Sequence, residues 1–185
     1  MSIEKSEPSI EQLQQLKNQW LFSQVEVDFP TRESVLGKAC YLDLIEATNT
    51  ITAFDIDELQ DSDSSAQFDW VKADFHKLTV LFSQFYASHS RVPVASKEYL
   101  QEFFAQIILD ESTPHSLCLG FAGPEVAAVA IVSCVKERVL VSDLLLADSC
   151  SEKAEVSAIL NVFGRELMDN QVNHSIYVHR SRYIK

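Results

Sequence analysis

One acidic residue stands inside an otherwise apolar stretch of this sequence. Asp143 lies within residues 138–147, where most of its neighbours are valine or leucine. A carboxylate in such a place can act as a general base, directly or through a water molecule, for the amine of a substrate. It can equally face solvent or bond to a neighbouring turn, because side chains alternate between the two faces of a strand. Asp143 is therefore the first candidate for chemistry, with a structural role as the alternative.

The loop that follows, residues 147–153, has the residue types of a helix start. Ser149 and Glu152 have the spacing of a capping box, in which side chains satisfy the first N–H groups of a helix. The loop contains no glycine, its cation is Lys153, and Asp148 and Glu152 make it acidic. This pattern favours Asp148 and Glu152 as capping residues rather than catalytic ones.

The other metal-ligating and nucleophilic residues form no recognised motif. Neither HxxxH nor HExxH spacing occurs among the five histidines, which are His76, His89, His115, His174 and His179. The four cysteines form no CxxC pair, and Cys118 and Cys134 fall in apolar stretches, where cysteine acts as a small buried hydrophobe. A calcium loop starting at Asp61 would have Ala66 in place of the required glycine and Lys72 in place of the final glutamate. We expect no metal site.

A sheet must position these candidates, and residues 116–179 predict one. Three apolar segments separated by short polar turns precede a helical pattern at 151–169 and a fourth apolar segment. Strands joined by tight turns pair antiparallel, whereas strands joined by a crossover helix pair in parallel. A strand at 68–71, a helix at 75–89 and a second helix after Ser96 come before them. We expect the phenylalanine-rich segments of these two helices, 75–86 and 99–108, to lie in the core. We expect an α/β fold of the α+β type, with a mixed, mainly antiparallel sheet flanked by helices.

The first 66 residues differ in charge from the rest. They hold 13 acidic and 4 basic residues, whereas residues 67–185 hold 14 and 11, so most of the formal net charge of −12 belongs to the front. Helical patterns near 10–21 and 32–47 and a β-branched segment at 49–54 precede a polar stretch at 55–66. The residues that we expect to face inward are apolar: in the first helix Ile10, Leu13, Leu16, Trp20 and Leu21, and in the second Val35, Leu36, Ala39, Leu42 and Ile45. We therefore divide the chain into an acidic, mainly helical segment (1–66), with a linker near 55–66, and a second domain (67–185).

Charge and hydropathy also exclude several classes of protein. A nucleic-acid-binding protein normally has a basic face, and this acidic chain offers only a short basic tail after residue 179. No apolar run reaches the roughly 18 residues that cross a bilayer. The N-terminus lacks the apolar core of a signal peptide. We expect a cytoplasmic protein that binds neither nucleic acid nor membrane.

The order strand, helix, helix, three strands, helix, strand resembles that of the GNAT (Gcn5-related N-acetyltransferase) superfamily. The resemblance covers about residues 67–179. Its local patterns are residues 82–86 with 96–100 for the paired first helices, 119–126 for the second and third strands with their glycine-containing turn, 139–147 for the fourth strand and 156–167 for the next helix. No one of these patterns is specific, and together they carry the fold prediction.

The resemblance implies an acyl-CoA-dependent N-acyltransferase that transfers an acetyl group from acetyl-CoA to an amine. In the family the fourth strand has a bulge whose backbone N–H binds the acyl carbonyl, and a glycine-containing loop and helix start hold the pyrophosphate. Carried onto this chain, the resemblance gives Asp143 a role in deprotonating the amine. It assigns the cofactor to Leu145, Leu146, Ala147, Ser149, Ser151 and Lys153.

Two departures from the family favour a second interpretation, a non-catalytic GNAT-like module that binds a protein partner or a small effector. The loop lacks the family's glycines, and few residues follow the fifth strand. Either the front segment completes the sheet or another chain does, and an exposed strand edge would favour a homo-oligomer or a protein partner. The enzyme interpretation requires a cleft between the fourth and fifth strands, which full pairing of those strands would close.

Overall fold

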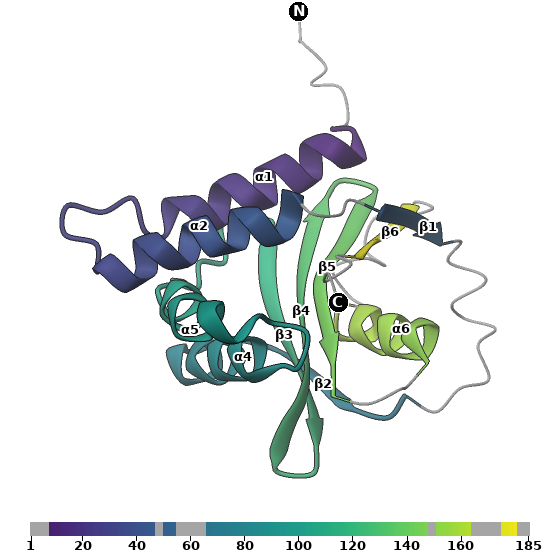
Figure 1. Cartoon of the computed structure of the whole chain (residues 1–185). Coiled ribbons are helices and arrows are strands. Elements are labelled where there is room, and N and C mark those ends of the chain that lie inside the picture. Colours follow the sequence, from purple (N-terminus) through teal and green to yellow (C-terminus); the bar gives the residue numbers. More distant parts are fainter. Residues whose placement is uncertain (1–7, 47–49, 55–65, 148–150, 164–174, 181–185) are drawn as a thin grey trace, which may run out of the picture.

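The computed structural model describes residues 8–46, 50–54, 66–147, 151–163 and 175–180, and these form a mixed sheet with helices on both faces. Four helices lie on one face and α6 lies on the other (Figure 1). The helices are α1 (Ile10–Ser23), α2 (Arg32–Glu46), α4 (His76–Ser88), α5 (Lys97–Ala105) and α6 (Glu152–Val162), with a short 3₁₀ turn, η1 (Val94–Ser96), before α5. The predicted fold class is confirmed.

Six strands make the sheet, in the order β1-β6-β5-β4-β3-β2. They are β1 (Thr50–Phe54), β2 (Asp69–Lys72), β3 (His115–Ala122), β4 (Glu125–Val135), β5 (Arg138–Leu146) and β6 (Ser175–Arg180). The hairpin strands β3, β4 and β5 pair antiparallel, and β5 pairs with β6 in parallel. The pairing directions predicted from the connections are therefore confirmed.

Strand β1, from the acidic front, completes the sheet beside β6. It pairs antiparallel with β6 from Thr50 opposite Arg180 to Phe54 opposite Ile176. Of the two ways to complete the sheet, the structure has the one in which this chain does so itself, and β1 rather than β6 forms that edge. Helices α1 and α2 also pack on the sheet and on α5, so the front shares a core with the residues that follow it. The predicted linker at 55–66 lies almost wholly outside the described residues.

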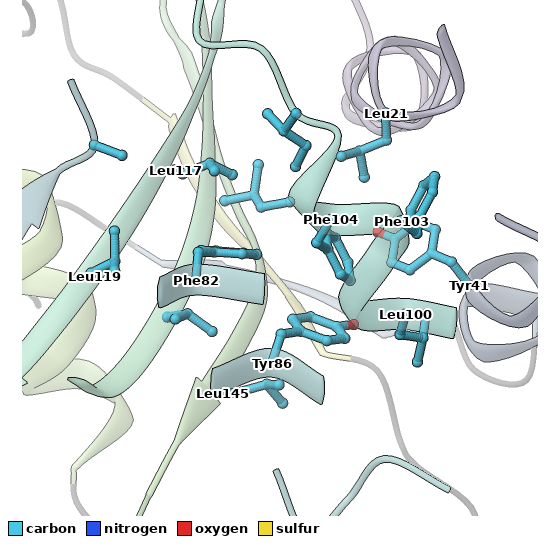
Figure 2. Packing of buried hydrophobic residues seen from close by; sticks show 14 of the residues in the cluster. Leu21, Tyr41, Phe82, Tyr86, Leu100, Phe103, Phe104, Leu117, Leu119 and Leu145 are labelled. Atoms are coloured by element: carbon cyan, nitrogen blue, oxygen red, sulfur yellow. The ribbon is translucent and has the colours of Figure 1, made fainter. Parts of the chain in front are cut away.

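The core between the sheet and the four helices is rich in aromatic side chains. Phe82, Tyr86, Phe103 and Phe104 pack against one another and against Tyr41 of α2 (Figure 2). A second apolar cluster lies under α6, on the other face of the sheet. The prediction that the two Phe-rich helices form core is confirmed for Phe82, Phe103 and Phe104, whereas Phe75 and Ile108, expected on the same faces, are exposed. No helix in the described part of the chain has the length and apolar character needed to cross a membrane.

The inward faces of α1 and α2 differ from the predicted ones. In α1 the buried residues are Leu13, Lys17 and Leu21, whereas Leu16, expected inside, is largely exposed. In α2 the buried residues are Ser34, Gly37, Tyr41 and Ile45, and the predicted Val35 and Ala39 face outward. Both helices are turned so that one polar side chain on each, Lys17 and Tyr41, enters the core.

Gly37 explains why α2 takes this orientation. A Cβ atom added there would lie 2.0 Å from the carbonyl oxygen of Tyr99 and 2.6 Å from Cβ of Phe103. Helices α2 and α5 therefore approach so closely that only glycine fits between them. Tyr41, one turn further along α2, is thereby directed toward the sheet.

Candidate functional site

Strands β5 and β6 separate partway along their length. Their parallel pairing runs only from Arg138 opposite Ser175 to Val141 opposite Val178. β5 continues to Leu146, while β6 continues beside β1 to Arg180. β5 and β6 are the predicted fourth and fifth strands. The enzyme interpretation requires that they do not pair along their whole length, and the described residues meet this requirement.

The backbone of β5 is irregular at the point of separation. Opposite β4, the register shifts between Val129 and Ile131, which pair with Leu145 and Ser142. The extra residues include Asp143, whose φ of 54° lies in the left-handed region. Aspartate is one of the few residues other than glycine whose backbone adopts this conformation readily. The bulge that the resemblance implies in this strand is therefore present, and Asp143 is part of it.

The side chain of Asp143 is buried and held by three groups from three helices. Lys17 Nζ of α1 donates a hydrogen bond to Asp143 Oδ2 at 2.9 Å. The Tyr41 hydroxyl of α2 donates to Oδ1 at 2.8 Å and lies 3.0 Å from Oδ2. The Tyr86 hydroxyl of α4 donates to Oδ1 at 3.3 Å. Three segments far apart in sequence therefore converge on one carboxylate.

The ammonium group of Lys17 is as fully enclosed as its partner. Its side chain is 0% exposed, and Nζ also donates to the Tyr41 hydroxyl. Nζ lies 5.1 Å from the centre of the Tyr41 ring, within range of a cation–π interaction. A buried ion pair is stable only when hydrogen bonds satisfy the groups around it, and here two tyrosines do so.

His179 extends this polar cluster on β6, immediately after the last residue that pairs with β5. Its Nε2 lies 3.2 Å from the side-chain amide nitrogen of Gln14, which donates to it. Burial lowers the pKa of His179, the charge of Asp143 raises it and that of Lys17 lowers it, with a net lowering. His179 is therefore neutral near pH 7, and Lys17 is the cation that balances Asp143.

These contacts also set the ionisation of Asp143. Burial by itself would raise the pKa of this carboxyl, but the charge and hydrogen bond of Lys17, together with His179 and Tyr41, lower it below its ordinary value. Asp143 is thus ionised near neutral pH. An ionised carboxylate with a tyrosine hydroxyl beside it can hold and orient an ammonium group.

The backbone groups predicted to hold an acyl chain lie just beyond the bulge. The Ala147 N–H donates to the Ala127 carbonyl of β4 at 2.8 Å. Because backbone groups alternate in direction along a strand, those of Leu146 point away from β4, toward the side that β6 has left. His89, which ends α4, lies there, and its Nε2 donates to the Leu146 carbonyl at 3.0 Å. The Leu145 side chain is buried in the core.

The residues predicted at the phosphate end are placed as follows. Ser151, rather than Ser149, is the N-cap of α6, and its hydroxyl accepts from the Ala154 N–H at 3.4 Å. Ser149 lies outside the described residues. Lys153 points toward β1, with Nζ 5.8 Å from the centre of the Phe54 ring. The structure therefore brings Asp143 and Leu146 to the strand separation, whereas Ser151 and Lys153 lie at the start of α6.

An acyl-CoA requires a strand edge for its acyl-bearing arm and N–H donors for its phosphates. The edge of β5 beyond the bulge fits the first requirement, because Leu146 faces the side left by β6. The start of α6 directly follows β5, and a helix N-terminus favours an anion. Glu152 and Glu155 in the first turn of α6 oppose that preference. The described residues therefore fit the acyl-bearing arm better than the phosphates.

The residues that bond to Asp143 directly, Lys17, Tyr41 and Tyr86, were not predicted as site residues, and neither was His179. Lys17, Tyr41 and Tyr86 all lie in helices whose inward faces were assigned from apolar residues alone. The sequence carries one usable signal, because Lys17 stands four residues after Leu13 and four before Leu21. A charged residue at this spacing lies on the same helix face as its apolar neighbours. No comparable signal marks Tyr41 or Tyr86 as partners of Asp143.

No protein-family model matches this sequence, and no curated protein matches it either. Among solved structures, a GCN5-related N-acetyltransferase from Kribbella flavida aligns at 11% identity and a TM-score of 0.43, over 76% of this chain and 53% of that one. A functionally unknown conserved protein from Staphylococcus epidermidis ATCC 12228 aligns at 11% identity and a TM-score of 0.48, over 95% of this chain and 72% of that one.

A tandem GNAT protein from the clavulanic acid biosynthesis pathway, solved without AcCoA, aligns at 12% identity and a TM-score of 0.39. The alignment covers 74% of this chain and 46% of that protein. This chain thus spans about half the length of the two GNAT proteins that it matches. Proteins of one fold carry many different activities, so these alignments concern the arrangement of the chain alone.

Proposed function

We propose that this chain is an acyl-CoA-dependent N-acyltransferase domain that uses Asp143 to bind and orient an amine. The observation that carries the proposal is the position of the Lys17 amine. Nζ lies 2.9 Å from Asp143 Oδ2 at the bulge of β5, where β5 and β6 separate. This carboxylate already holds a primary amine beside the part of β5 that, among the described residues, extends beyond its pairing with β6. It thus has the components that amide formation from an amine requires.

The residues of the chain would divide the work as follows. An acyl-CoA, when bound, supplies a thioester carbonyl that an amine can attack, and Leu146 on the β5 edge, with Ser151 and Lys153 at the start of α6, would hold it. Asp143 orients the amine and assists its deprotonation. The Tyr41 hydroxyl, bonded to both Lys17 and Asp143, fixes the direction of the amine. The aromatic core around Tyr41 and Tyr86 excludes water from the carboxylate.

Calorimetric titration with acetyl-CoA and with free CoA tests the proposal. We expect binding, weakened in Lys153→Glu, because a carboxylate at the start of α6 repels the cofactor phosphates. Lys77→Glu is the matched control: it makes the same charge change at an exposed residue of α4, on the opposite face of the sheet from α6. Absence of heat, together with no thermal shift at millimolar CoA, would rule the proposal out.

One observation favours a second candidate, the non-catalytic GNAT-like module. The Leu146 carbonyl already has a protein partner, His89, so part of the strand edge that faces away from β4 is filled by the chain itself. This candidate predicts that neither acetyl-CoA nor CoA binds, and that the acidic chain associates with itself or with a basic partner. Sedimentation over a range of concentrations and ionic strengths separates the two candidates, since an electrostatic association weakens as salt is added.

A further inference from the structure

The inward stripe of α1 has a lysine where an apolar residue would serve stability as well. Leu13, Lys17 and Leu21 are spaced by four residues, and all three are 0% exposed. Replacing a buried ion pair with apolar residues of similar volume is often neutral or stabilising. The need to pack α1 on the sheet therefore does not explain the amine of Lys17, and its surroundings indicate another role.

Those surroundings match what a primary ammonium group requires. Asp143 supplies an anion at 2.9 Å, the Tyr41 hydroxyl supplies a second acceptor, and the Tyr41 ring supplies an aromatic face 5.1 Å away. The aliphatic stem of Lys17 passes between Leu13 and Leu21 on the same helix face. This combination of an anion, a neutral acceptor, an aromatic face and apolar neighbours is suited to an unbranched alkylammonium group.

The polar groups that surround the Lys17 ammonium come from elements other than α1. Asp143 belongs to β5, Tyr41 to α2 and Tyr86 to α4, and Tyr41 and Tyr86 donate to Asp143 directly. Helix α1 supplies the ammonium group and its apolar neighbours, Leu13 and Leu21. Removal of the Lys17 side chain would therefore leave an anionic, tyrosine-lined site of the size of a butylammonium ion.

We propose that Lys17 is an internal pseudosubstrate: it occupies an alkylammonium-binding site that accepts an outside amine only when the Lys17 side chain leaves. This proposal rests on the proposed function, because the amine acceptor of the acyltransferase would bind to Asp143 in the same way as Lys17 does. The binding itself requires no cofactor. The ligand class is a primary amine on an unbranched chain of about four carbons, the length of the lysine side chain.

Chemical rescue of Lys17→Ala tests the proposal. The thermal midpoint of this variant is measured with butylammonium, methylammonium or tetramethylammonium chloride, against sodium chloride at equal ionic strength. At ten times its dissociation constant, a ligand that binds only the folded state raises the midpoint of a domain of this size by about 3–6 °C. We expect that rise with butylammonium, a smaller one with methylammonium and none with tetramethylammonium, which has no N–H donor.

Lys17→Met is the matched control, because methionine fills the place of the lysine stem with an apolar side chain and leaves no space for the amine. Equal responses of Lys17→Ala and Lys17→Met, equal responses to butylammonium and tetramethylammonium, or no response at all would each overturn the proposal. If Lys17→Ala is unfolded, the same salts are tested for recovery of the near-ultraviolet circular dichroism of the folded protein. Failure of butylammonium to restore that signal beyond tetramethylammonium would overturn it as well.

Titration of acetyl-CoA into the same variants keeps the two proposals separate. If butylammonium rescues Lys17→Ala while acetyl-CoA does not bind, the amine site stands and the acyltransferase proposal fails. If acetyl-CoA binds but no amine rescues the variant, the acyltransferase proposal stands and Lys17 is a structural residue. If the pseudosubstrate proposal holds, Lys17→Ala also gains transfer to added butylamine relative to the wild type.

Discussion

Two buried carboxylates lie on opposite faces of the same sheet, and they are held in different ways. Glu155 of α6 accepts from the Gln67 N–H at 2.6 Å and from Trp70 Nε1 at 2.7 Å, both neutral donors. Asp143 faces a full positive charge, Lys17, and two tyrosine hydroxyls, from a backbone in the left-handed region. Each carboxylate joins a helix to a strand, but only Asp143 is paired with a group of opposite charge.

The difference indicates which of the two sites is suited to a ligand. The donors to Glu155 belong to β2 and the residue before it, so the carboxylate ties α6 to the sheet edge and needs nothing further. The ammonium partner of Asp143 is a single side chain on α1, and another amine would satisfy the same carboxylate. Glu155 therefore acts in docking alone, whereas Asp143 combines docking with recognition of a cation.

The largest expected effect comes from breaking the charged pair. Lys17→Met leaves a buried carboxylate without its cation, and Asp143→Asn leaves a buried cation without its anion while keeping a residue that tolerates positive φ. Each change should lower the free energy of unfolding by about 3–5 kcal/mol. The double variant should lose less than the sum of the two. Urea unfolding of all four proteins measures this coupling.

Lys38→Met provides the control for the charged pair. Lys38 pairs with Glu26 at 2.8 Å, close to the 2.9 Å between Lys17 and Asp143, but the Glu26 side chain is 65% exposed. Exposed pairs contribute at most about 1 kcal/mol. If Lys17→Met costs no more than Lys38→Met, the buried pair does not stabilise the fold and the contrast with Glu155 disappears.

As the pH is lowered, the structure on the sheet face that carries Asp143 should lose stability before the structure on the face that carries α6. Burial, and after it the charge of Lys17, lowers the pKa of His115 to about 4. Its unfolded form therefore binds a proton below about pH 6.5 while the folded form does not, so stability falls as pH drops from about 6.5 to 4. For the 6% exposed His115 the loss reaches about 3 kcal/mol at pH 4.

Urea unfolding at several pH values, with hydrogen exchange to locate the loss, measures this effect. His115→Gln should reduce the slope, whereas the exposed His76→Gln should leave it unchanged. Part of the slope should remain, because burial also lowers the pKa values of His89 and His179. Asp143 acts at lower pH, since its stabilising charge is lost only as pH falls through its own lowered pKa. Earlier acid opening of α6 than of α1 would contradict the comparison.

A smaller effect is expected at Glu155. In Glu155→Gln the amide oxygen can still accept one hydrogen bond, but the amide nitrogen faces a second donor. We expect a loss of about 1–3 kcal/mol, less than for Lys17→Met, because the donors left unpaired are neutral. Trp70 fluorescence during urea unfolding reports on this site directly. Glu125→Gln, an exposed carboxylate at the start of β4, is the control and should change stability by less than about 0.5 kcal/mol.

The fold could be predicted from sequence where elements are neighbours along the chain. The hairpins from β3 to β5 follow from apolar runs broken by short turns, and the parallel pairing of β6 follows from the intervening helix. The partner of β6 could not be derived, because β1 pairs with it across more than a hundred residues. A short β-branched segment carries no information about which distant strand edge it joins.

The candidate site, like the fold, could be predicted only in part. Asp143 could be identified as a candidate because a charged residue within an apolar strand is rare. Its partners could not, because the inward face of a helix is predicted from its apolar residues. Apolar spacing therefore does not identify Lys17 or Tyr86 as partners of Asp143, although both side chains are buried. Which helix brings a cation to a given carboxylate depends on helix packing, such as the close approach at Gly37. A single sequence does not encode such packing in any local pattern.

The smallest expected effect distinguishes the two tyrosines on Asp143. The Tyr41 hydroxyl donates at 2.8 Å and accepts from Lys17, whereas the Tyr86 hydroxyl donates at 3.3 Å. Tyr41→Phe should therefore cost about 1 kcal/mol more than Tyr86→Phe, because hydrogen bonds to charged groups contribute more when they are short and well aligned. Urea unfolding of both variants, which keep the aromatic rings, measures the difference.

The same two variants sharpen the comparison further in the Lys17→Ala background. If Tyr41 recognises the amine, Tyr41→Phe should reduce the rescue by butylammonium several-fold, whereas Tyr86→Phe, whose hydroxyl donates to the carboxylate at 3.3 Å, should reduce it less. Equal costs for both tyrosines, in stability and in rescue, would mean that they serve as packing around a structural ion pair. Asp143 would then be equivalent to Glu155, a carboxylate that joins a helix to a strand and recognises nothing else.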